Sequence, residues 1–138
     1  MQSIIDHFQK FLPLTETEQG LILARAKQRN IKRRQWILQE GLICRHYTFI
    51  VKGCFKMYAV DDRGVEHNIQ FAAENDWIAD IGSFHSKKPG GFFIEAVESS
   101  EIIQIEQQDL YFLYINIPKL DRIFKVIIEN KYIELQNR

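Results

Sequence analysis

The chain has little of what membrane-spanning, disulfide-rich or strongly charged proteins contain. Two cysteines, Cys44 and Cys54, are too few and too loosely spaced for a zinc site or a disulfide framework. The 18 basic and 18 acidic side chains cancel, so no net field attracts nucleic acid or an anionic membrane. No apolar run approaches the roughly 20 residues of a membrane span, and the charged start is unlike a signal peptide. We therefore expect one soluble, cytoplasmic domain with a single core.

Signatures of enzymes and of metal sites are also missing from the sequence. His46, His67 and His85 are isolated, and His7 falls in a predicted helix, so no His-x-His metal-binding pair occurs. An iron–sulfur cluster needs four thiolates, which two cysteines cannot supply. A haem needs only one or two axial ligands, so His46, His67 and Cys54 stay open as haem ligands. No nucleophile lies in a recognisable catalytic motif, and we predict neither catalytic nor metal-binding residues.

The first quarter of the chain is predicted to be helical. Apolar residues recur at helical spacing over residues 4–12, and Pro13 then interrupts the pattern. Thr15 and Glu18 have the spacing of a capping box, in which each side chain accepts from the other residue's backbone N–H. We therefore place N-terminal helices within residues 1–26.

Residues 27–106 carry strand signals instead. Turn residues separate the apolar runs, and Gly41, Gly53 and Gly64 suit turn positions that need a positive φ. Short strands at this spacing predict a mainly β domain, a double-stranded jelly roll with flanking helices. The predicted strands are QRNIK, WILQ, YTFIVK, CFKMYAV, EHNIQFA, WIADI, FFIEAV and EIIQI.

The helical period returns in residues 107–138. One helix is predicted over residues 107–116, and Pro118 suits the first turn of a long last helix. That last helix is apolar around most of its circumference, which predicts cover on more than one side. A second copy of the helix would supply one cover, and complete burial within one chain is the alternative. The predicted seam of the homodimer is Phe124, Ile127, Ile128, Tyr132 and Leu135.

Four stretches follow one another in a specific order: Glu40-Gly41, YTFIVKGCFKMYAVDDRGVEHNIQF, NDWIADIGSF and EAVESSEIIQIEQQDL. In this order they resemble the cyclic-nucleotide-binding effector domain of the catabolite-activator and Fnr-type (Crp/Fnr) transcription regulators. The resemblance covers nearly all of residues 1–138, and implies that a ligand in the roll changes how the long helices pair. In that family a helix-turn-helix beyond the long helix reads DNA. The chain stops at Arg138, so we expect no DNA binding by it alone, and DNA binding through a missing C-terminal domain if it is truncated.

The resemblance also implies where a cyclic nucleotide would bind. Nucleotide-binding members have Gly-Glu-Leu at the start of a short helix, where the Glu accepts from the ribose, and then an Arg that neutralises the phosphate. The first three fall on Ala79, Asp80 and Ile81. The Arg and the hydroxyl residue after it fall on Gly90 and Gly91, so the bidentate guanidinium is absent. We therefore expect no response to cyclic AMP.

Lysines and aromatic residues surround this segment. Lys87 or Lys88 would supply only a point charge, and strand alternation puts either Phe92 or Phe93 inside the roll. The pocket would therefore hold an uncharged molecule or be filled by its own side chains. The predicted ligand-pocket residues are Phe71, Asp80, Ile81, Gly82, Ser83, Gly90, Gly91 and Phe93.

Two functions remain open from the sequence. One is a ligand-sensing effector domain of a transcription regulator, with a small molecule of unknown identity and no other cofactor. The other is a structural dimerisation module that regulates through protein contacts. The basic run at residues 25–34 would be a phosphate-contacting patch or simply the solvated face of a helix end and an edge strand.

Overall fold

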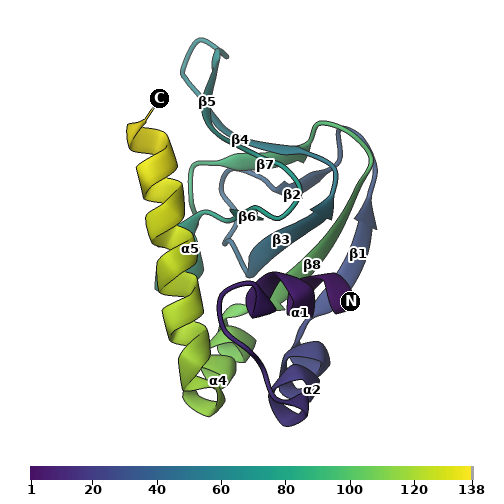
Figure 1. Ribbon diagram of the computed structural model, residues 1–138. Helices are drawn as coiled ribbons and strands as arrows, with labels where there is room; N and C mark the ends of the chain where they lie inside the picture. Colours follow the sequence, from purple (N-terminus) through teal and green to yellow (C-terminus); the bar gives the residue numbers. More distant parts are fainter. Residues whose placement is uncertain (138) are drawn as a thin grey trace. The chain divides into compact units, whose positions relative to one another are not determined.

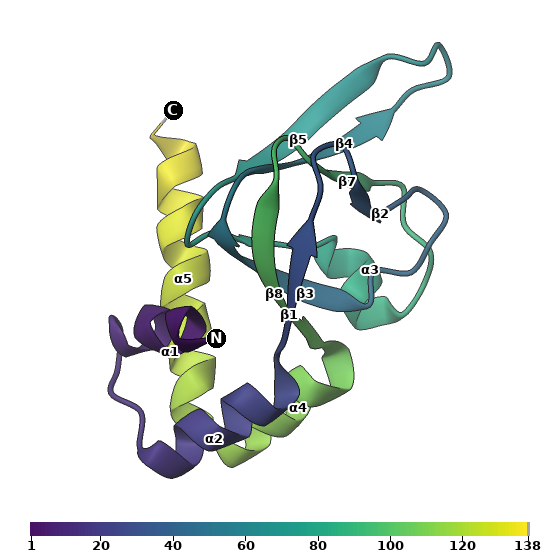
Figure 2. The same ribbon diagram turned by 90° about the vertical axis from the view of Figure 1, so that its right-hand side faces the viewer.

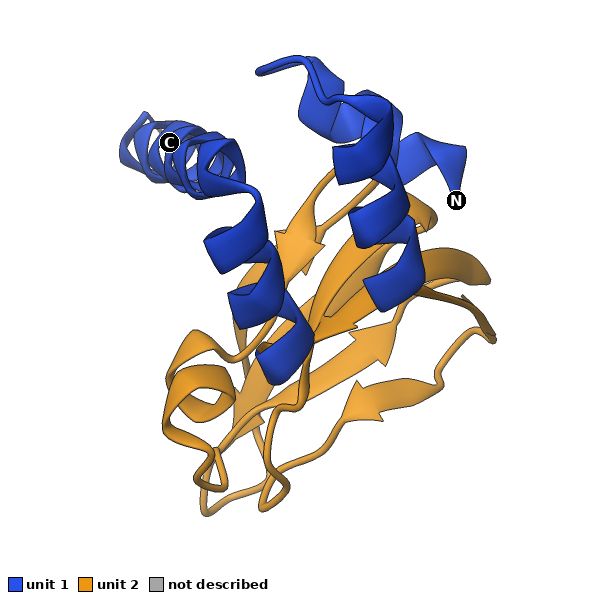
Figure 3. Cartoon of the chain, turned by 90° about the horizontal axis from the view of Figure 1, so that it is seen from below, with its two compact units in different colours: residues 1–25, 108–138 blue, residues 26–107 orange. Residues whose placement is uncertain are grey.

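The computed structural model describes residues 1–137, and these residues form two compact units. Residues Ala26–Gln107 form the roll unit, and residues Met1–Arg25 with those from Gln108 onward form the helical unit (Figure 3). Every helix and strand predicted from the sequence is present within the described residues (Figure 1). None of the helices in residues 1–137 is long and apolar enough to cross a membrane.

The roll unit consists of two antiparallel sheets of four strands each. The first sheet has the order β1-β8-β3-β6 and the second has the order β2-β7-β4-β5, so most neighbouring strands are far apart in sequence. In Figure 2, the β4–β5 hairpin extends away from the other strands of the roll. The strands are β1 (Lys27–Ile31), β2 (Trp36–Leu38), β3 (His46–Lys52), β4 (Phe55–Val60), β5 (Glu66–Ala72), β6 (Trp77–Ile78), β7 (Phe93–Ala96) and β8 (Ser100–Glu106).

Strand alternation determines which side chains enter the core of the roll. On β3 and β8, Ile50 lies opposite Ile102, and both side chains are fully buried. On β7, Ile94 and Ala96 are buried whereas Phe93 and Glu95 are partly exposed. The strand predicted as WIADI ends early at Ile78, because Asp80 caps the short helix α3 (Ile81–Ser86).

Three turns between strands place a glycine at a positive φ angle. Gly41, Gly53 and Gly64 have φ angles of +87°, +110° and +81°, as the sequence predicts. At Gly53 space is limiting as well, because a Cβ there would lie 2.8 Å from the backbone Cα of Ser100. A side chain at this position would therefore be strained in φ and would collide with β8.

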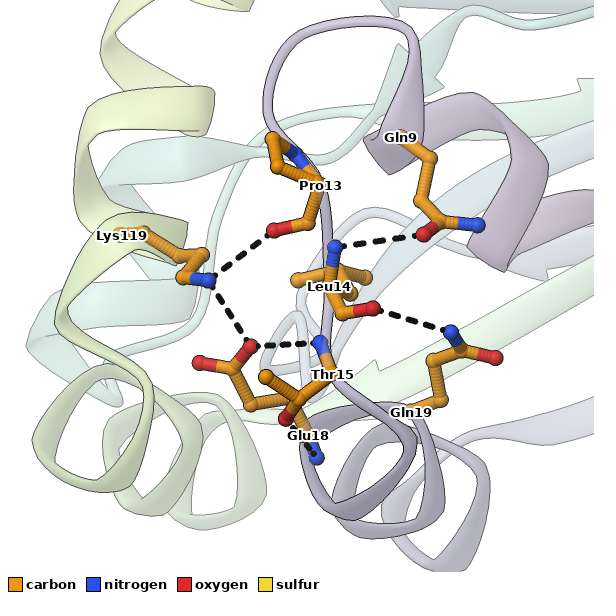
Figure 4. A network of polar contacts seen from close by, with 7 residues as sticks. All are labelled: Gln9, Pro13, Leu14, Thr15, Glu18, Gln19 and Lys119. Carbon is orange, nitrogen blue, oxygen red and sulfur yellow. Dashed lines mark hydrogen bonds and ion pairs between the residues drawn. The ribbon is translucent and has the colours of Figure 1, made fainter.

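The helical unit contains α1 (Gln2–Gln9), α2 (Glu16–Arg25), α4 (Gln107–Asn116) and α5 (Pro118–Gln136). The predicted capping box is confirmed: Thr15 N–H donates to Glu18 Oε1 at 2.8 Å, and Glu18 N–H donates to Thr15 Oγ1 at 3.2 Å (Figure 4). Lys119 Nζ contacts Glu18 Oε1 at 2.9 Å and donates to the carbonyl of Pro13 at 3.0 Å. Both the Thr15 N–H and Lys119 favour the charged carboxylate, and they lower the pKa of Glu18. The first turn of α5 is thereby bonded to the α1–α2 connection.

The two halves of α5 differ in burial. Phe124 is only 2% exposed, and its ring lies 5.6 Å from that of Phe8 and 5.9 Å from that of Tyr114. This corrects its assignment to the dimer seam, because Phe124 lies with Leu120 and Ile123 on the buried side of the helix. The alternative of complete burial within one chain is also wrong. Ile127 is half-buried, and the remaining predicted seam residues Ile128, Tyr132 and Leu135 are 55%, 63% and 47% exposed.

Candidate functional site

The segment from Ala79 to Gly91, called here the cassette segment, is held together by its own hydrogen bonds. Asp80 is the N-cap of α3, and its Oδ1 accepts from Ser83 N–H at 3.2 Å. Lys87 ends the helix in the left-handed conformation, with φ of +60°, and its N–H bonds back to Ser83 O. The carboxylate predicted to meet a ligand is thus engaged within its own helix.

Ser83 and Gly90 connect the cassette segment to the loop at residues 41–44. The Ser83 hydroxyl accepts from Cys44 N–H at 2.8 Å and donates to Lys88 O at 2.6 Å. Gly41 N–H donates to Gly90 O at 2.9 Å, and Gly90 N–H donates to Leu42 O at 3.2 Å. These bonds use several of the polar groups that a ligand in the cassette segment would need.

Gly90 packs directly against Asp80. A Cβ at Gly90 would lie 2.1 Å from Asp80 Oδ2 and 3.3 Å from the Ser83 Cβ, so a side chain at this position would require the Asp80 carboxylate to move. At Gly91, by contrast, an added Cβ would meet no atom of the described chain within 4 Å. The position that the family resemblance assigns to the phosphate-binding Arg is therefore filled by the Asp80 carboxylate.

The other predicted pocket residues divide between this segment and other places. Ile81 and Gly82 are exposed in the first turn of α3, beside Asp80 and Ser83. The structure corrects the assignment of Phe71, which is 53% exposed on β5 and lines a separate hollow of about 310 Å³ with Arg33, Arg34 and Lys56. Lys56 in this hollow is paired with Glu66 at 3.1 Å.

Phe93 is also outside the roll interior, because the inward positions of β7 belong to Ile94 and Ala96. Its ring stacks on Tyr58 at 5.2 Å and lies 5.9 Å from Trp36. This cluster is on the outer side of the second sheet, so Phe93 is corrected from a pocket residue to part of an aromatic surface.

A cavity of about 400 Å³ lies in the roll unit, where Pro89 of the cassette segment forms part of its lining, and we call it the β3–β8 cavity. Among the residues that the structure describes, none of the predicted ligand-pocket residues lines it. Its apolar lining includes Ile37, Leu38, Leu42, Ile43 and Ile94, and its polar lining includes Cys44, Arg45, His46, Thr48 and Gln104. The volume is in the range of small-molecule sites, and the mixed lining suits a ligand with both apolar and polar parts.

Two buried polar side chains lie next to each other in this cavity. Thr48 on β3 is opposite Gln104 on β8, and these residues are only 2% and 3% exposed. Gln104 Nε2 donates to Thr48 Oγ1 at 3.1 Å, and Arg29 Nη1 donates to Gln104 Oε1 at 3.0 Å. Because Arg has only donors, this contact fixes the amide with its oxygen toward Arg29 and its nitrogen toward Thr48.

The wall around His46 is rich in positive charge. His46 Nε2 lies 3.8 Å from Glu106 Oε1, a contact that favours the protonated ring. Burial lowers the pKa of His46 despite this contact, and the nearby cations Arg29, Lys27 and Arg45 act in the same direction as burial. Burial and these cations therefore favour the neutral ring of His46, and the cations outnumber the carboxylate beside it.

The thiols and the other histidines form no metal site. Cys44 and Cys54 are free, and burial raises the pKa of the Cys44 thiol. His67 Nε2 contacts Asp61 Oδ2 at 2.8 Å. Within residues 1–137, no group of three or more His, Cys, Asp or Glu side chains is arranged to hold a metal ion.

Thr48 and Gln104 were not among the residues predicted from the sequence to contact a ligand. Both lie inside the predicted strands YTFIVK and EIIQI, among apolar neighbours. The available signal was a polar side chain at a position whose strand neighbours are buried, since such a group needs a partner inside the roll.

Comparison with known proteins relates this geometry to one fold. A family model described as the cyclic nucleotide-binding domain matches residues 28–116. No curated protein matches the chain. Solved structures with the same fold include a catabolite activator protein from Thermus thermophilus, at 16% identity and a TM-score of 0.73. The alignment covers 91% of this chain and 59% of that protein, so this chain spans less than two thirds of its length.

Two solved domains match over nearly the whole chain. The sensor domain of the transcriptional regulator DNR from Pseudomonas aeruginosa is 15% identical, with a TM-score of 0.76, over 99% of this chain and 91% of that domain. A cyclic nucleotide-binding domain from Methylobacillus flagellatus is 16% identical, with a TM-score of 0.77, over 99% of this chain and 78% of that one. At these identities the likeness concerns the fold.

Proposed function

The chain belongs to the cyclic nucleotide-binding domain family, and on that premise we propose that it is a ligand-sensing regulatory domain of a Crp/Fnr-type transcriptional regulator whose effector is not cyclic AMP. The observation that carries the proposal is the packing of Gly90 against Asp80. A cyclic phosphate is bound in the family by a guanidinium at this position. Here the carboxylate of Asp80 takes that space and would repel a phosphate.

The remaining groups of the cassette segment do not replace the guanidinium. Asp80 Oδ1 is bonded to Ser83 N–H, and the Ser83 hydroxyl is bonded to Cys44 and Lys88. Lys87 and Lys88 are exposed, where a flexible ammonium loses most of its attraction for an anion to solvent screening. We therefore expect cyclic AMP to bind weakly or not at all.

The partner in this proposal is a second copy of the chain. Ile128, Tyr132 and Leu135 form an exposed apolar stripe on the C-terminal half of α5. Pairing two such stripes would bury apolar surface, and each Å² buried would stabilise the dimer by roughly 25 cal/mol. A ligand would regulate the domain if it bound two arrangements of the paired helices with different affinity.

Calorimetry and native mass spectrometry test the two parts of this proposal. Titration with cyclic AMP and cyclic GMP is expected to give no micromolar binding. Micromolar binding that disappears in Asp80→Ala would overturn the assignment. Protein purified without added nucleotide is expected to be a dimer that retains, or accepts from a cell extract, a small molecule of definite mass.

The dimer itself has a matched test on α5. Ile128→Asp is expected to give a monomer by light scattering, because it places a charge in the apolar stripe. Asn130→Asp introduces the same charge at another exposed position of the helix and is expected to leave the mass unchanged. Equal masses for both variants would refute pairing through this stripe.

A ligand-free dimerisation module is the second candidate, and the self-bonded cassette segment favours it. In this case regulation would come from protein contacts alone. Hydrogen exchange in α5 separates the candidates, since a sensor changes its α5 protection when ligand is removed and a ligand-free module does not.

A further inference from the structure

The β3–β8 cavity contains buried donor hydrogens for which residues 1–137 supply no acceptor. Gln104 Nε2 carries two hydrogens and donates one of them to Thr48 Oγ1. The second amide hydrogen and the hydroxyl hydrogen of Thr48 have no acceptor among residues 1–137. Both residues are more than nine-tenths buried, so bulk water does not readily replace the missing acceptors. Donors in this setting favour a ligand with acceptor oxygens.

The hydrogen-bond chain strengthens these donors. Arg29 donates to Gln104 Oε1 at 3.0 Å, and Gln104 in turn donates to Thr48 at 3.1 Å. The positive guanidinium that donates to the amide oxygen polarises the amide, which makes its N–H groups better donors. The network therefore directs positive electrostatic potential from Arg29 toward the cavity.

The cavity wall is positively charged, and it therefore favours the same acceptor-bearing ligand as the donors. Arg45 lines the cavity and is exposed, with no ion pair to any described residue. Arg29 and Lys27 add positive charge near His46, against the single nearby carboxylate of Glu106. An anion would gain from these cations, whereas a ligand cation would be repelled by them.

The rest of the lining is apolar. Ile37, Leu38 and Ile43 line the cavity together with Ile94, whose side chain is 2% exposed. About 400 Å³ is enough for a small organic molecule. An inorganic anion would leave these side chains in contact with water, so the lining favours an apolar body attached to the anionic group.

We propose that the β3–β8 cavity binds a small organic anion with an apolar body, whose oxygens accept from Thr48 and Gln104 and whose charge is met by Arg45. This rests on the proposed sensing function, and it places the ligand against Thr48 and Gln104 instead of against Asp80, with only Pro89 of the cassette segment in the lining. Carboxylates and phosphate monoesters share the required chemistry.

Calorimetric titration with octanoate, monooctyl phosphate and octanol tests the proposal on the full chain. Octanoate or monooctyl phosphate is expected to bind, and the comparison of the two identifies the preferred head group. Octanol has the same apolar body without charge and is expected to bind about tenfold more weakly or worse. Equal binding of octanol and the anions, or no binding of either, would overturn the proposal.

Three variants locate the binding. Arg45→Gln removes an exposed charge and is expected to weaken anion binding about tenfold. The double variant Thr48→Val with Gln104→Leu is expected to do the same, with folding checked by circular dichroism. Arg33→Gln removes a comparable exposed arginine from the separate hollow and is the matched control. Unchanged affinity in the first two variants would refute the site.

Hydrogen exchange in α5 distinguishes failure of the site from failure of the sensing function. Anion binding that requires Arg45 but leaves α5 protection unchanged would retain the site and refute sensing. A response of α5 to a natural ligand that persists in Arg45→Gln would retain sensing and refute the site.

Discussion

The cassette segment and the β3–β8 cavity are neighbours in one roll, but they use their polar groups in opposite ways. In the cassette segment, Asp80 and Ser83 are bonded to the segment itself and to Cys44. In the cavity, Thr48 and Gln104 retain donors that no described residue accepts. The residues that look most ligand-like in the sequence are thus structural, and two residues hidden in strands have spare capacity. Unused hydrogen-bonding capacity is a better guide to a site than residue type.

The largest effect on stability is expected at Gly90, where a substitution tests whether the cassette segment is closed by Asp80. Gly90→Ala would place a Cβ 2.1 Å from Asp80 Oδ2, so the carboxylate must move. Because Asp80 Oδ1 also caps α3, this movement is expected to cost about 0.5–2 kcal/mol of unfolding free energy. Gly91→Ala is the control, since nothing in residues 1–137 lies within 4 Å of its added Cβ. Urea denaturation of both variants measures the difference. Similar stability for both would mean that Asp80 does not close the cassette segment.

A related variant tests whether the family's ligand site is recoverable. Gly90→Arg restores the residue type that the resemblance assigns to phosphate binding. We expect it to destabilise the roll without producing cyclic AMP binding, because the new side chain begins inside the space of the Asp80 carboxylate. Calorimetry that detected tight cyclic AMP binding by this variant would show that the segment opens readily.

A smaller effect is expected in the cavity. Gln104→Leu removes the donor to Thr48 and is expected to cost about 1 kcal/mol. Adding Thr48→Val is expected to cost little more, because the two side chains then form an apolar pair of similar shape. A double-mutant cycle by urea denaturation measures this coupling. Fully additive losses would mean that the bond between Gln104 and Thr48 contributes nothing to stability, and would weaken the contrast.

The smallest effect is expected from pH. Burial lowers the pKa of His46 below its ordinary 6.5, so the folded state resists protonation that the unfolded chain accepts. The unfolded state binds more protons as the pH falls below about 6.5, and stability is therefore lost between that pH and the lower folded pKa. His46→Gln is expected to flatten this part of the stability curve, measured by thermal unfolding at several pH values. An unchanged slope would place His46 in a solvated setting.

Much of the fold was predictable from local signals in the sequence. The capping box of Thr15 and Glu18, the start of α5 at Pro118 and all eight strands depend on short-range patterns. The site depended on long-range contacts. The approach of Gly90 to Asp80 and the pairing of Thr48 with Gln104 are set by how distant strands meet, which no local pattern records.

Strand alternation gave only half of the answer for the aromatic residues. It predicted that Phe92 and Phe93 face opposite sides, but not which one faces the interior. The register of β7 with β4 decides this, because Ile94 lies opposite Met57 and both side chains are buried. For the same reason, the helical stripe on α5 was visible in the sequence, but the boundary between its buried and exposed parts was not.

The bonds from Lys119 to Pro13 and Glu18 fix the N-terminal end of α5. Beyond Phe124, every described residue of the helix is exposed or half-buried, and Lys125–Gln136 extends about 18 Å at the rise of an α-helix. A rotation of about 10° about Phe124 would move the far end of the helix by about 3 Å, which follows from this length. Rotations too small to disrupt the capping box would therefore produce larger shifts at Tyr132 and Leu135. The α5 helix of a second copy, packed against these residues, would have to move with them.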